Sequence, residues 1–220
     1  MRTDPVAPVP SSALVVIAHP DDESFGLGAI LDHLVAGGTD VRVLCFTRGE
    51  ASTLGATSDL GAVREAELQC AAEVLGVRRV TLLGFADGAL TDTPPATLDA
   101  IVESQLADAQ LLVVFEPDGV TGHPDHRAAT AAAERVAEAR SLPVLEWGVS
   151  PEVAERLNAE LGTEFVGLPG VDLIVDRVRQ HRAIACHASQ ARENPVLVRR
   201  LALQERVERV RVRPAEGVKP

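Results

Sequence analysis

The chain has 220 residues and a hydrophobic fraction of 46%, which fits one domain with a sizeable buried core. Its formal net charge of -11 at pH 7 excludes the common kinds of nucleic-acid-binding protein, because these neutralise phosphates with clustered cations. No apolar run approaches the length of a membrane-spanning helix. We therefore expect no nucleic-acid partner and no membrane partner, and the sequence leaves open whether the chain forms an oligomer.

The N-terminal residues and the cysteines bear on the cellular compartment. Residues 1–12 contain three prolines and predict a flexible segment. They lack the apolar stretch of a secretory signal, so we expect a cytoplasmic protein. Cys45, Cys70 and Cys186 lie far apart and form no C-x-x-C pair. This spacing predicts small buried hydrophobic residues rather than a disulfide framework or a thiolate metal site.

Short apolar runs alternate with helical patterns over residues 13–150. The apolar runs are rich in Val and Leu and predict buried strands at residues 13–18, 41–46, 79–85, 111–115 and 143–147. Stretches rich in Ala and Leu lie between them and predict helices at residues 26–36, 62–75, 96–107 and 127–140. Alternating strands and helices are typical of a doubly wound α/β domain, a Rossmann-like and mostly parallel sheet with helices on both faces. We assign the catalytic core to this region.

Beyond Ser150 the pattern is less regular. It predicts a helix at 151–161, one or two strands within 165–175 and a helix at 177–188. We assign residues 151–220 to edge strands and closing helices of the same single domain. Arginines near the C-terminus alternate with apolar residues and are expected to lie on solvated faces: Arg199, Arg200, Arg206, Arg209, Arg211 and Arg213.

Two polar clusters follow predicted strands. The first strand runs directly into H-P-D-D-E at residues 19–23, and H-P-D-H at residues 123–126 comes shortly after the fourth. Ligands of open α/β sheets bind outside the carboxyl ends of the strands, at the point where the strand order reverses. If the first and fourth strands are neighbours, we expect the two clusters to converge there.

The residue types in these clusters suit a catalytic zinc (Zn2+) site. His19, Asp22 and His126 supply two imidazoles and a carboxylate, a ligand set that leaves one coordination position for water. Asp21 lies beside the metal without having to bind it, so it can take a proton from that water. His123 is placed to stabilise an oxyanion, and we expect it to do so best as an imidazolium.

Other interpretations of the clusters must be compared with this one. A lone H-P-D turn or a lone H-x-x-H is common, but both clusters follow apolar strands here, which favours a metal site. Non-haem iron oxygenases use a similar ligand set. Those with an H-x-D motif resemble all-β barrels, which the alternation of strands and helices contradicts. A sugar- or nucleotide-binding module without catalysis stays open, because a fold does not dictate a function.

The same segments carry a family resemblance. AHPDDE at residues 18–23 and GHPDH at 122–126 resemble the paired signatures of the PIG-L/LmbE-like zinc N-deacetylases. Four more segments resemble the family in order: FTRGE at 46–50, VREAEL at 63–68, LGFADG at 83–88 and HASQ at 187–190. The resemblance implies an amide hydrolase that removes an acetyl group from a small N-acetylglucosaminide-type conjugate. Another small-molecule amide, such as a thiol-sugar conjugate or an antibiotic, is the alternative substrate.

Carried over by position, the resemblance implies His19, Asp22 and His126 as zinc ligands, Asp21 as general base and His123 as charge stabiliser. Asp125 would orient a histidine, fixing its tautomer and ring angle.

Arg64 and Asp87 would contact the substrate, unless Arg64 forms an exposed helix pair with Glu65 or Glu67 and Asp87 is a cap. His187 and Gln190 belong to a segment that closes over the site in the family. Trp147 either stacks on a sugar ring or packs the rim.

The sequence departs from the family at one point. Relatives with a tyrosine shortly before the GHPDH segment can use it at the oxyanion, whereas this chain has Val120-Thr121 there and contains no tyrosine.

Overall fold

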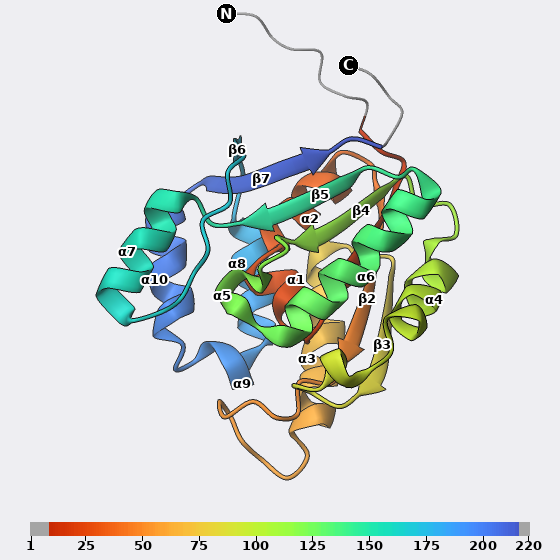
Figure 1. The fold of residues 1–220 in the computed structure, drawn as a ribbon. Helices are drawn as coiled ribbons and strands as arrows, with labels where there is room; N and C mark the ends of the chain where they lie inside the picture. Colours follow the sequence, from red (N-terminus) through yellow and green to blue (C-terminus); the bar gives the residue numbers. More distant parts are fainter. Residues whose placement is uncertain (1–8, 216–220) are drawn as a thin grey trace, which may run out of the picture.

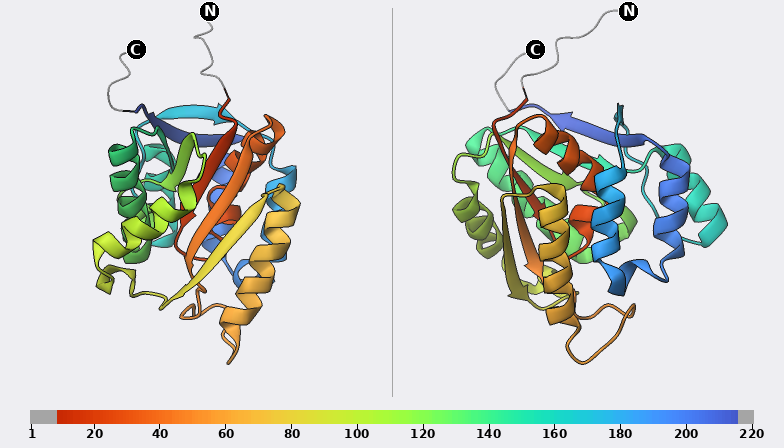
Figure 2. Two further views of the ribbon diagram at one scale, coloured as in Figure 1. Left: turned by 90° about the vertical axis from the view of Figure 1, so that its right-hand side faces the viewer. Right: turned by 180° about the vertical axis from the view of Figure 1, so that it is seen from behind.

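The computed structural model describes residues 9–215 and confirms the predicted fold class. The protein is one α/β domain built on a seven-stranded sheet with helices on both faces (Figures 1 and 2). Most of the predicted flexible segment, residues 1–8, lies outside the described residues. The chain makes its first described hydrogen bond at Pro10, whose carbonyl accepts from the Thr39 hydroxyl at 2.8 Å.

The sheet has the strand order β3-β2-β1-β4-β5-β7-β6. The first five strands in the chain are parallel: β1 (Ser12–Ile17), β2 (Asp40–Thr47), β3 (Arg79–Phe85), β4 (Leu111–Phe115) and β5 (Val144–Gly148). β1 pairs with β2 on one side and with β4 on the other. The carboxyl ends of β1 and β4 are therefore neighbours, which confirms the expected switch point.

Both faces of the sheet are covered. One face packs against α2 (Gly28–Ala36), α3 (Leu60–Leu75) and α8 (Val178–Cys186), and the other against α4 (Pro95–Leu106) and α6 (Pro124–Arg140). The edge-on view in Figure 2 shows this division. All six residues of β1 are buried, because its side chains alternate between the two apolar layers. None of the described helices is both long and apolar enough to cross a membrane.

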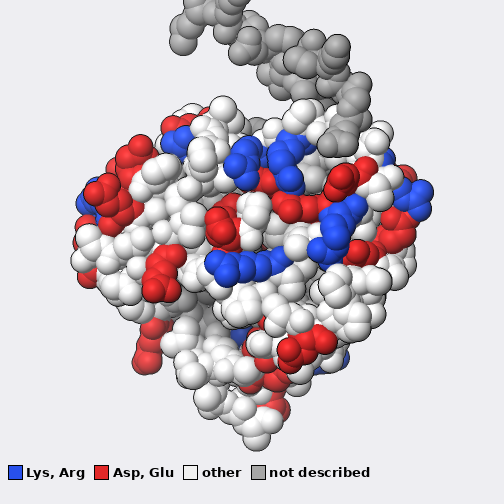
Figure 3. Space-filling view, viewed as in Figure 1, with Lys and Arg blue, Asp and Glu red and all other residues white. Residues whose placement is uncertain are grey.

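The C-terminal residues extend the sheet. β7 (Val207–Arg213) pairs antiparallel with β5 and with β6 (Val171–Ile174), while α7 (Pro151–Leu161) and α10 (Pro195–Gln204) pack beside them (Figure 1). The helix at 195–204 and the strand at 207–213 fall within the region assigned to edge strands and closing helices, but the sequence analysis gives no bounds for them, because alternating Arg and Val residues resemble a solvated surface. That expectation is wrong for Arg200, which is only 4% exposed. On the face viewed in Figure 3, acidic and basic side chains are interspersed.

The expectation for the cysteines is wrong for two of the three. Cys70 on α3 forms a disulfide with Cys186 at the end of α8, with their Cα atoms 5.9 Å apart. Cys45 is free and buried, as expected. The bonded pair is separated by 116 positions in the sequence and meets only because α3 and α8 pack together, so spacing alone carried no signal.

Replacing Cys70 with serine is expected to lower the free energy of unfolding by about 2–4 kcal/mol, because the cross-link closes a long loop and restricts the unfolded chain. Urea unfolding of the oxidised parent and of Cys70→Ser measures the difference. Adding reductant should bring the parent to the stability of the variant. Equal unfolding free energies under oxidising conditions would contradict the prediction.

Candidate active site

The two polar clusters are positioned by the ends of β1 and β4. After β1 the chain turns at residues 18–21 into the short helix α1 (Asp22–Phe25). After β4 it passes through α5 (Gly119–Gly122) to His123, the N-cap residue of α6. Pro124 occupies the first turn of α6, where its missing N–H breaks no helical hydrogen bond. The two turns therefore face each other across neighbouring strand ends.

The structure brings the three predicted metal ligands together. His19 Nδ1 lies 3.1 Å from His126 Nε2. Asp22 Oδ1 lies 3.2 Å from His126 Nε2, and Asp22 Oδ2 lies 3.8 Å from His19 Nδ1. Asp22 Oδ2 also accepts the backbone N–H groups of Ala18 and His19, which fixes the carboxylate and leaves Oδ1 turned to the histidines.

The outer nitrogens of both histidines face acceptors. His19 Nε2 lies 3.0 Å from Asp87 Oδ1 and 3.3 Å from Asp125 Oδ2, and His126 Nδ1 lies 3.3 Å from the Gly119 carbonyl. Because these oxygens accept hydrogen bonds, each neutral ring carries its proton on the outer nitrogen. Two lone pairs and a carboxylate oxygen then converge on one point. This donor set fits a zinc-class cation.

The charges around His19 and Asp22 also suit a cation. Burial by itself would lower the pKa of His19, but hydrogen bonds to Asp125 and Asp87 and the charge of Asp22 raise it to about 10. Burial likewise opposes ionisation of Asp22, yet His126 and His19 hold the pKa of this carboxyl well below its usual range. His19 thus lies among carboxylates, and Asp22 stays ionised, so both residues suit the binding of a cation.

His123 is a competing third ligand by distance alone, since His19, His123 and His126 each offer a ring nitrogen within 4.8 Å of the others. However, His123 Nδ1 accepts the backbone N–H of Asp125 at 3.2 Å, so the neutral ring carries its proton on Nε2. Burial, together with His126 and His19, lowers the pKa of His123. The lowered pKa favours the neutral form of this ring, and the role of His123 at an oxyanion stays a prediction.

Asp21 is held in an uncommon backbone conformation beside the three donors. Its φ of 110° lies in the left-handed region, which costs a non-glycine residue about 1–3 kcal/mol. Its carbonyl accepts from Ser24 N and Phe25 N, and its N–H donates to Glu23 Oε2 at 2.9 Å. Burial raises the pKa of Asp21 to about 6, although the charge of Arg64 lowers it.

Arg64 is buried, 3% exposed, and binds Asp21. Its Nη2 lies 2.9 Å from Asp21 Oδ2 and also donates to the Pro20 carbonyl, while Nη1 donates to the Gly49 carbonyl at 2.6 Å. The alternative of an exposed helix pair is therefore wrong. Gly49 lies next to it with a φ of 63°, in the left-handed region that favours glycine, and a Cβ there would displace the guanidinium of Arg64. Contact of Arg64 with the substrate stays a prediction.

Asp125 and Asp87 both hold His19. Asp125 accepts the backbone N–H groups of Gly88 and Leu90 at 2.7 and 3.0 Å, and Asp87 Oδ2 accepts that of Ala51 at 2.9 Å. Despite burial, the hydrogen bond to His19 lowers the pKa of each carboxyl. Asp125 thus contacts an imidazole, and both oxygens of Asp87 are engaged by the protein. The predicted contact of Asp87 with sugar hydroxyls stays a prediction.

Replacing Asp125 with asparagine is expected to weaken zinc binding about 10-fold to 100-fold, because His19 loses the charged acceptor that fixes its ring. Competition with a chromogenic chelator measures the affinity. Asp118→Asn is the matched control, since Asp118 is exposed in the loop before the same helix. Equal affinity in Asp125→Asn and the control would show that Asp125 does not position His19.

Sequence reasoning gave no role to Glu23 and left that of His187 open. Both are fully buried, and His187 Nε2 lies 2.6 Å from Glu23 Oε1, which also accepts from the Ser24 hydroxyl. Burial alone would lower the pKa of His187, but the Glu23 charge raises it. Glu23 is the last residue of the DDE motif, so its position was a usable signal. The pairing of Glu23 with His187 gave no such signal, because the two residues are 164 positions apart in the sequence.

Trp147, near the end of β5, is packed against the protein on several sides. It is 2% exposed, its Nε1 donates to Glu208 Oε2 at 2.7 Å, and the Arg200 guanidinium lies 5.2 Å from its ring centroid. Trp147 also lines a cavity beside Asp22 and His126, so its stacking on a sugar ring stays a prediction.

Two cavities meet beside the three donors. A polar pocket of about 330 Å³ is lined by His19, Ser52, Arg64, Asp87, His123 and Gln190, among others. An apolar chamber of about 240 Å³ has the apolar lining Phe25, Phe115, Trp147, Phe165, Val196 and Leu197. Asp21, Asp22 and His126 line both. Bound substrate can therefore occupy polar and apolar surroundings on either side of the metal position.

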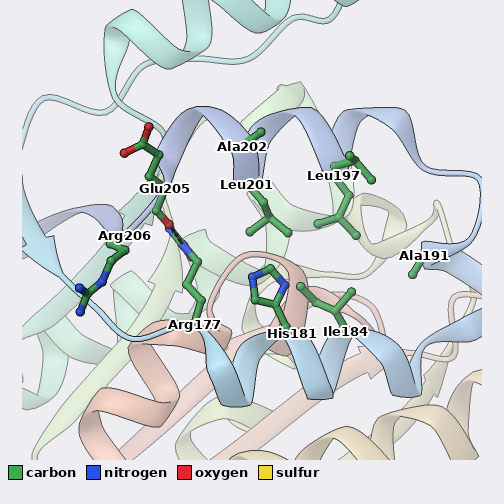
Figure 4. Close-up of a pocket in the computed structure, with 10 residues that line it drawn as sticks. Arg177, His181, Ile184, Ala191, Leu197, Leu201, Ala202, Glu205 and Arg206 are labelled. Atoms are coloured by element: carbon green, nitrogen blue, oxygen red, sulfur yellow. Dashed lines mark hydrogen bonds between the residues drawn. The ribbon is translucent and has the colours of Figure 1, made fainter.

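A separate groove of about 580 Å³ runs between α8 and α10 (Figure 4). Leu197 and Leu201 of α10 lie across it from His181 and Ile184 of α8. None of its lining residues is a predicted metal ligand or base, so the candidate active site is the pair of cavities at the sheet edge.

Comparisons with known proteins agree with this placement. A family model described as "PIG-L: GlcNAc-PI de-N-acetylase" matches residues 14–137. A Corynebacterium diphtheriae protein named 1D-myo-inositol 2-acetamido-2-deoxy-alpha-D-glucopyranoside deacetylase is 33% identical over 211 residues, covering 82% of this chain and 72% of that protein. The chain spans about half the length of other curated relatives that it matches, for example 54% of one from Mycobacterium sp. (strain KMS).

Solved structures share the fold at low sequence identity. The A40926 pseudoaglycone deacetylase Dbv21 superposes with a TM-score of 0.72 at 23% identity, covering 94% of this chain and 99% of that one. GalB, the 4-carboxy-2-hydroxymuconate hydratase of Pseudomonas putida KT2440, gives a TM-score of 0.72 at 18% identity, covering 96% and 99%. The fold therefore accommodates more than one reaction.

Proposed function

The chain belongs to the PIG-L family, and from this premise we propose that it is a zinc-dependent N-deacetylase acting on a small amino-sugar conjugate of the N-acetylglucosaminide type. The observation that carries the proposal is the convergence of His19 Nδ1, His126 Nε2 and Asp22 Oδ1 beside the carboxylate of Asp21. A protein that only binds sugars needs no such base next to a metal position.

Three residues would hold the ion: His19, Asp22 and His126. The chemistry that a zinc-class ion supplies in such a site is Lewis-acid activation of water and of a carbonyl group. Asp125 and Asp87 keep the proton of His19 on Nε2, so that Nδ1 stays free to bind.

Asp21 is the general base of the proposed reaction. Arg64 and the strained turn fix its carboxylate at the edge shared by the two cavities, within reach of a water molecule that attacks the amide. Asp21 takes the proton of that water and returns it to the departing amine nitrogen. The products are a carboxylate and a free amine.

His123 supports the developing oxyanion. His123 lines the polar pocket and its Nδ1 is fixed by the backbone of Asp125, so the ring is oriented before the substrate binds. Because its lowered pKa favours the neutral form, the ring stabilises the oxyanion as a hydrogen-bond donor and not as a full charge.

The substrate assignment rests on the polar pocket and on the names of the relatives. Guanidinium, amide, hydroxyl and carboxylate groups line this pocket and suit the hydroxyl groups of a sugar. The curated relative from Corynebacterium diphtheriae is named for an acetamidoglucose conjugate of inositol. The alternative is another small-molecule amide, and the zinc itself is part of the proposal.

Acetate release tests the proposal. Purified zinc-loaded protein is incubated with a panel of N-acetylglucosaminides, N-acetylated peptides and simple amides, and acetate and free amine are quantified together. Equimolar acetate and amine from the sugars are expected. Cleavage of peptides or other amides without any sugar would overturn the sugar assignment, and no amide cleavage at all would overturn the deacetylase.

The cytoplasmic location predicted from the sequence stays a prediction. The Cys70–Cys186 disulfide bears on it, because such bonds persist mainly in oxidising compartments. Quantifying free thiols in protein isolated with alkylation at the moment of lysis measures the redox state in the cell.

A further inference from the structure

The apolar chamber is continuous with the metal position. The ring of Phe115 lies 4.9 Å from that of His126 and 5.3 Å from that of Trp147, so aromatic surface begins directly beside a predicted ligand. Val196 and Leu197 of α10 and Phe165 add further apolar walls. A substrate amide at the metal position would therefore have one substituent next to this chamber.

The chamber is larger than an acetyl group needs. The methyl of an acetyl group is about the size of a water molecule, which takes up about 30 Å³ in the liquid. The chamber has a volume of about 240 Å³. Several methylene groups fit into such a space beyond the methyl.

Most of the side chains that line the chamber are apolar, and two of its polar side chains, Arg200 and Asn194, already bond to the protein. Arg200 donates to the Phe25 carbonyl and to Gln204 Oε1, and Asn194 Oδ1 accepts the N–H of Leu197 at 2.9 Å. A sugar ring in the chamber would leave hydroxyl groups without partners, which is costly in apolar surroundings. An alkyl chain needs no partners, and the polar pocket on the other side suits the sugar.

We propose that the apolar chamber binds the alkyl part of an N-acyl group longer than acetyl, with the sugar in the polar pocket and the amide between them. This proposal rests on the proposed function and names its acyl specificity. The reaction is hydrolysis. A bond forms between the water oxygen and the acyl carbon, the C–N bond breaks, the nitrogen takes up a proton, and a short fatty acid and a free amine leave.

An acyl series on one glucosamine conjugate tests the proposal. We expect kcat/KM to rise about threefold to fourfold for each buried methylene, and about tenfold from acetyl to butyryl. A parallel series varies the alkyl group of the aglycone while keeping N-acetyl. Acetyl as the best acyl group, or a gain confined to the aglycone series, would overturn the proposal while leaving the deacetylase intact.

A filling variant with a matched control locates the effect. Val196→Trp reduces the chamber, and we expect it to abolish the preference of hexanoyl over acetyl in kcat/KM. Val198→Trp is the control. Val198 lies two residues further along the same helix, is 65% exposed and lines the separate groove between α8 and α10. This variant should keep the preference of hexanoyl over acetyl. Equal preferences in the two variants would place the acyl group elsewhere.

Binding to metal-free protein separates this proposal from the proposed function. Calorimetry with N-hexanoylglucosamine and N-acetylglucosamine should show tighter binding and a more negative heat-capacity change for the longer acyl group, because more apolar surface is buried. Thr121→Trp, which narrows the chamber from α5, should remove the difference. Equal affinities for both ligands in the parent would overturn the chamber assignment even if neither ligand is hydrolysed.

Discussion

Replacing Asp21 with asparagine is expected to lower kcat by about 10²-fold to 10⁴-fold while zinc content stays at the parental level. The amide cannot take a proton from water, yet it has the shape of the carboxylate. Asparagine also tolerates the left-handed backbone at this position, where φ is 110°. The variant therefore tests proton transfer by Asp21 while the backbone of the turn is kept.

The measurement is kcat with metal content determined on the same sample. Asp172→Asn serves as the control, since its side chain is 54% exposed on β6 at the far edge of the sheet. Asp21→Asn also removes the Asp21–Arg64 ion pair. Thermal unfolding of both variants measures what this loss does to stability. Turnover within tenfold of the parent at full zinc occupancy would remove Asp21 from the mechanism.

The second large effect concerns the metal ligands. Asp22→Asn combined with His126→Ala is expected to abolish zinc binding and, with it, activity, because only one of the three predicted ligands, His19, remains. The amide oxygen of asparagine can still accept the N–H groups of Ala18 and His19, which now bond to Asp22 Oδ2. The turn after β1 is thereby kept while the negative charge is removed.

Elemental analysis of the purified protein checks this result, with about one zinc expected per parental chain on the basis of one three-ligand site. His181→Ala is the control for the loss of an imidazole, since His181 lies in the groove between α8 and α10 (Figure 4). Zinc at the parental level in the double variant would contradict the assignment of Asp22 and His126 as zinc ligands.

The parallel core was predictable because its central strands, β1, β2 and β4, are largely buried on both faces. Such strands read as continuous apolar runs, and the switch point between β1 and β4 follows from the strand order of doubly wound sheets. β7 was missed because its alternating Arg and Val residues match an exposed surface equally well. Arg211 and Arg213 bind Glu146 of β5, and that pairing exists only in the folded chain.

The sequence by itself determined which residues meet at the site. Each cluster is local, so a turn after a buried strand places His19 and Asp22 together, and the start of a helix places His123 and His126 together.

Only the tertiary structure decided what each residue does there. Arg64 holds Asp21, Asp87 joins Asp125 on His19, and Nδ1 of His123 accepts a backbone N–H. The apolar chamber and the disulfide likewise join elements far apart in the chain. Burial and hydrogen bonds set the protonation of these side chains, and the packing of distant elements sets the volume of the chamber. Neither can be derived from residue types and spacing along a short stretch of sequence.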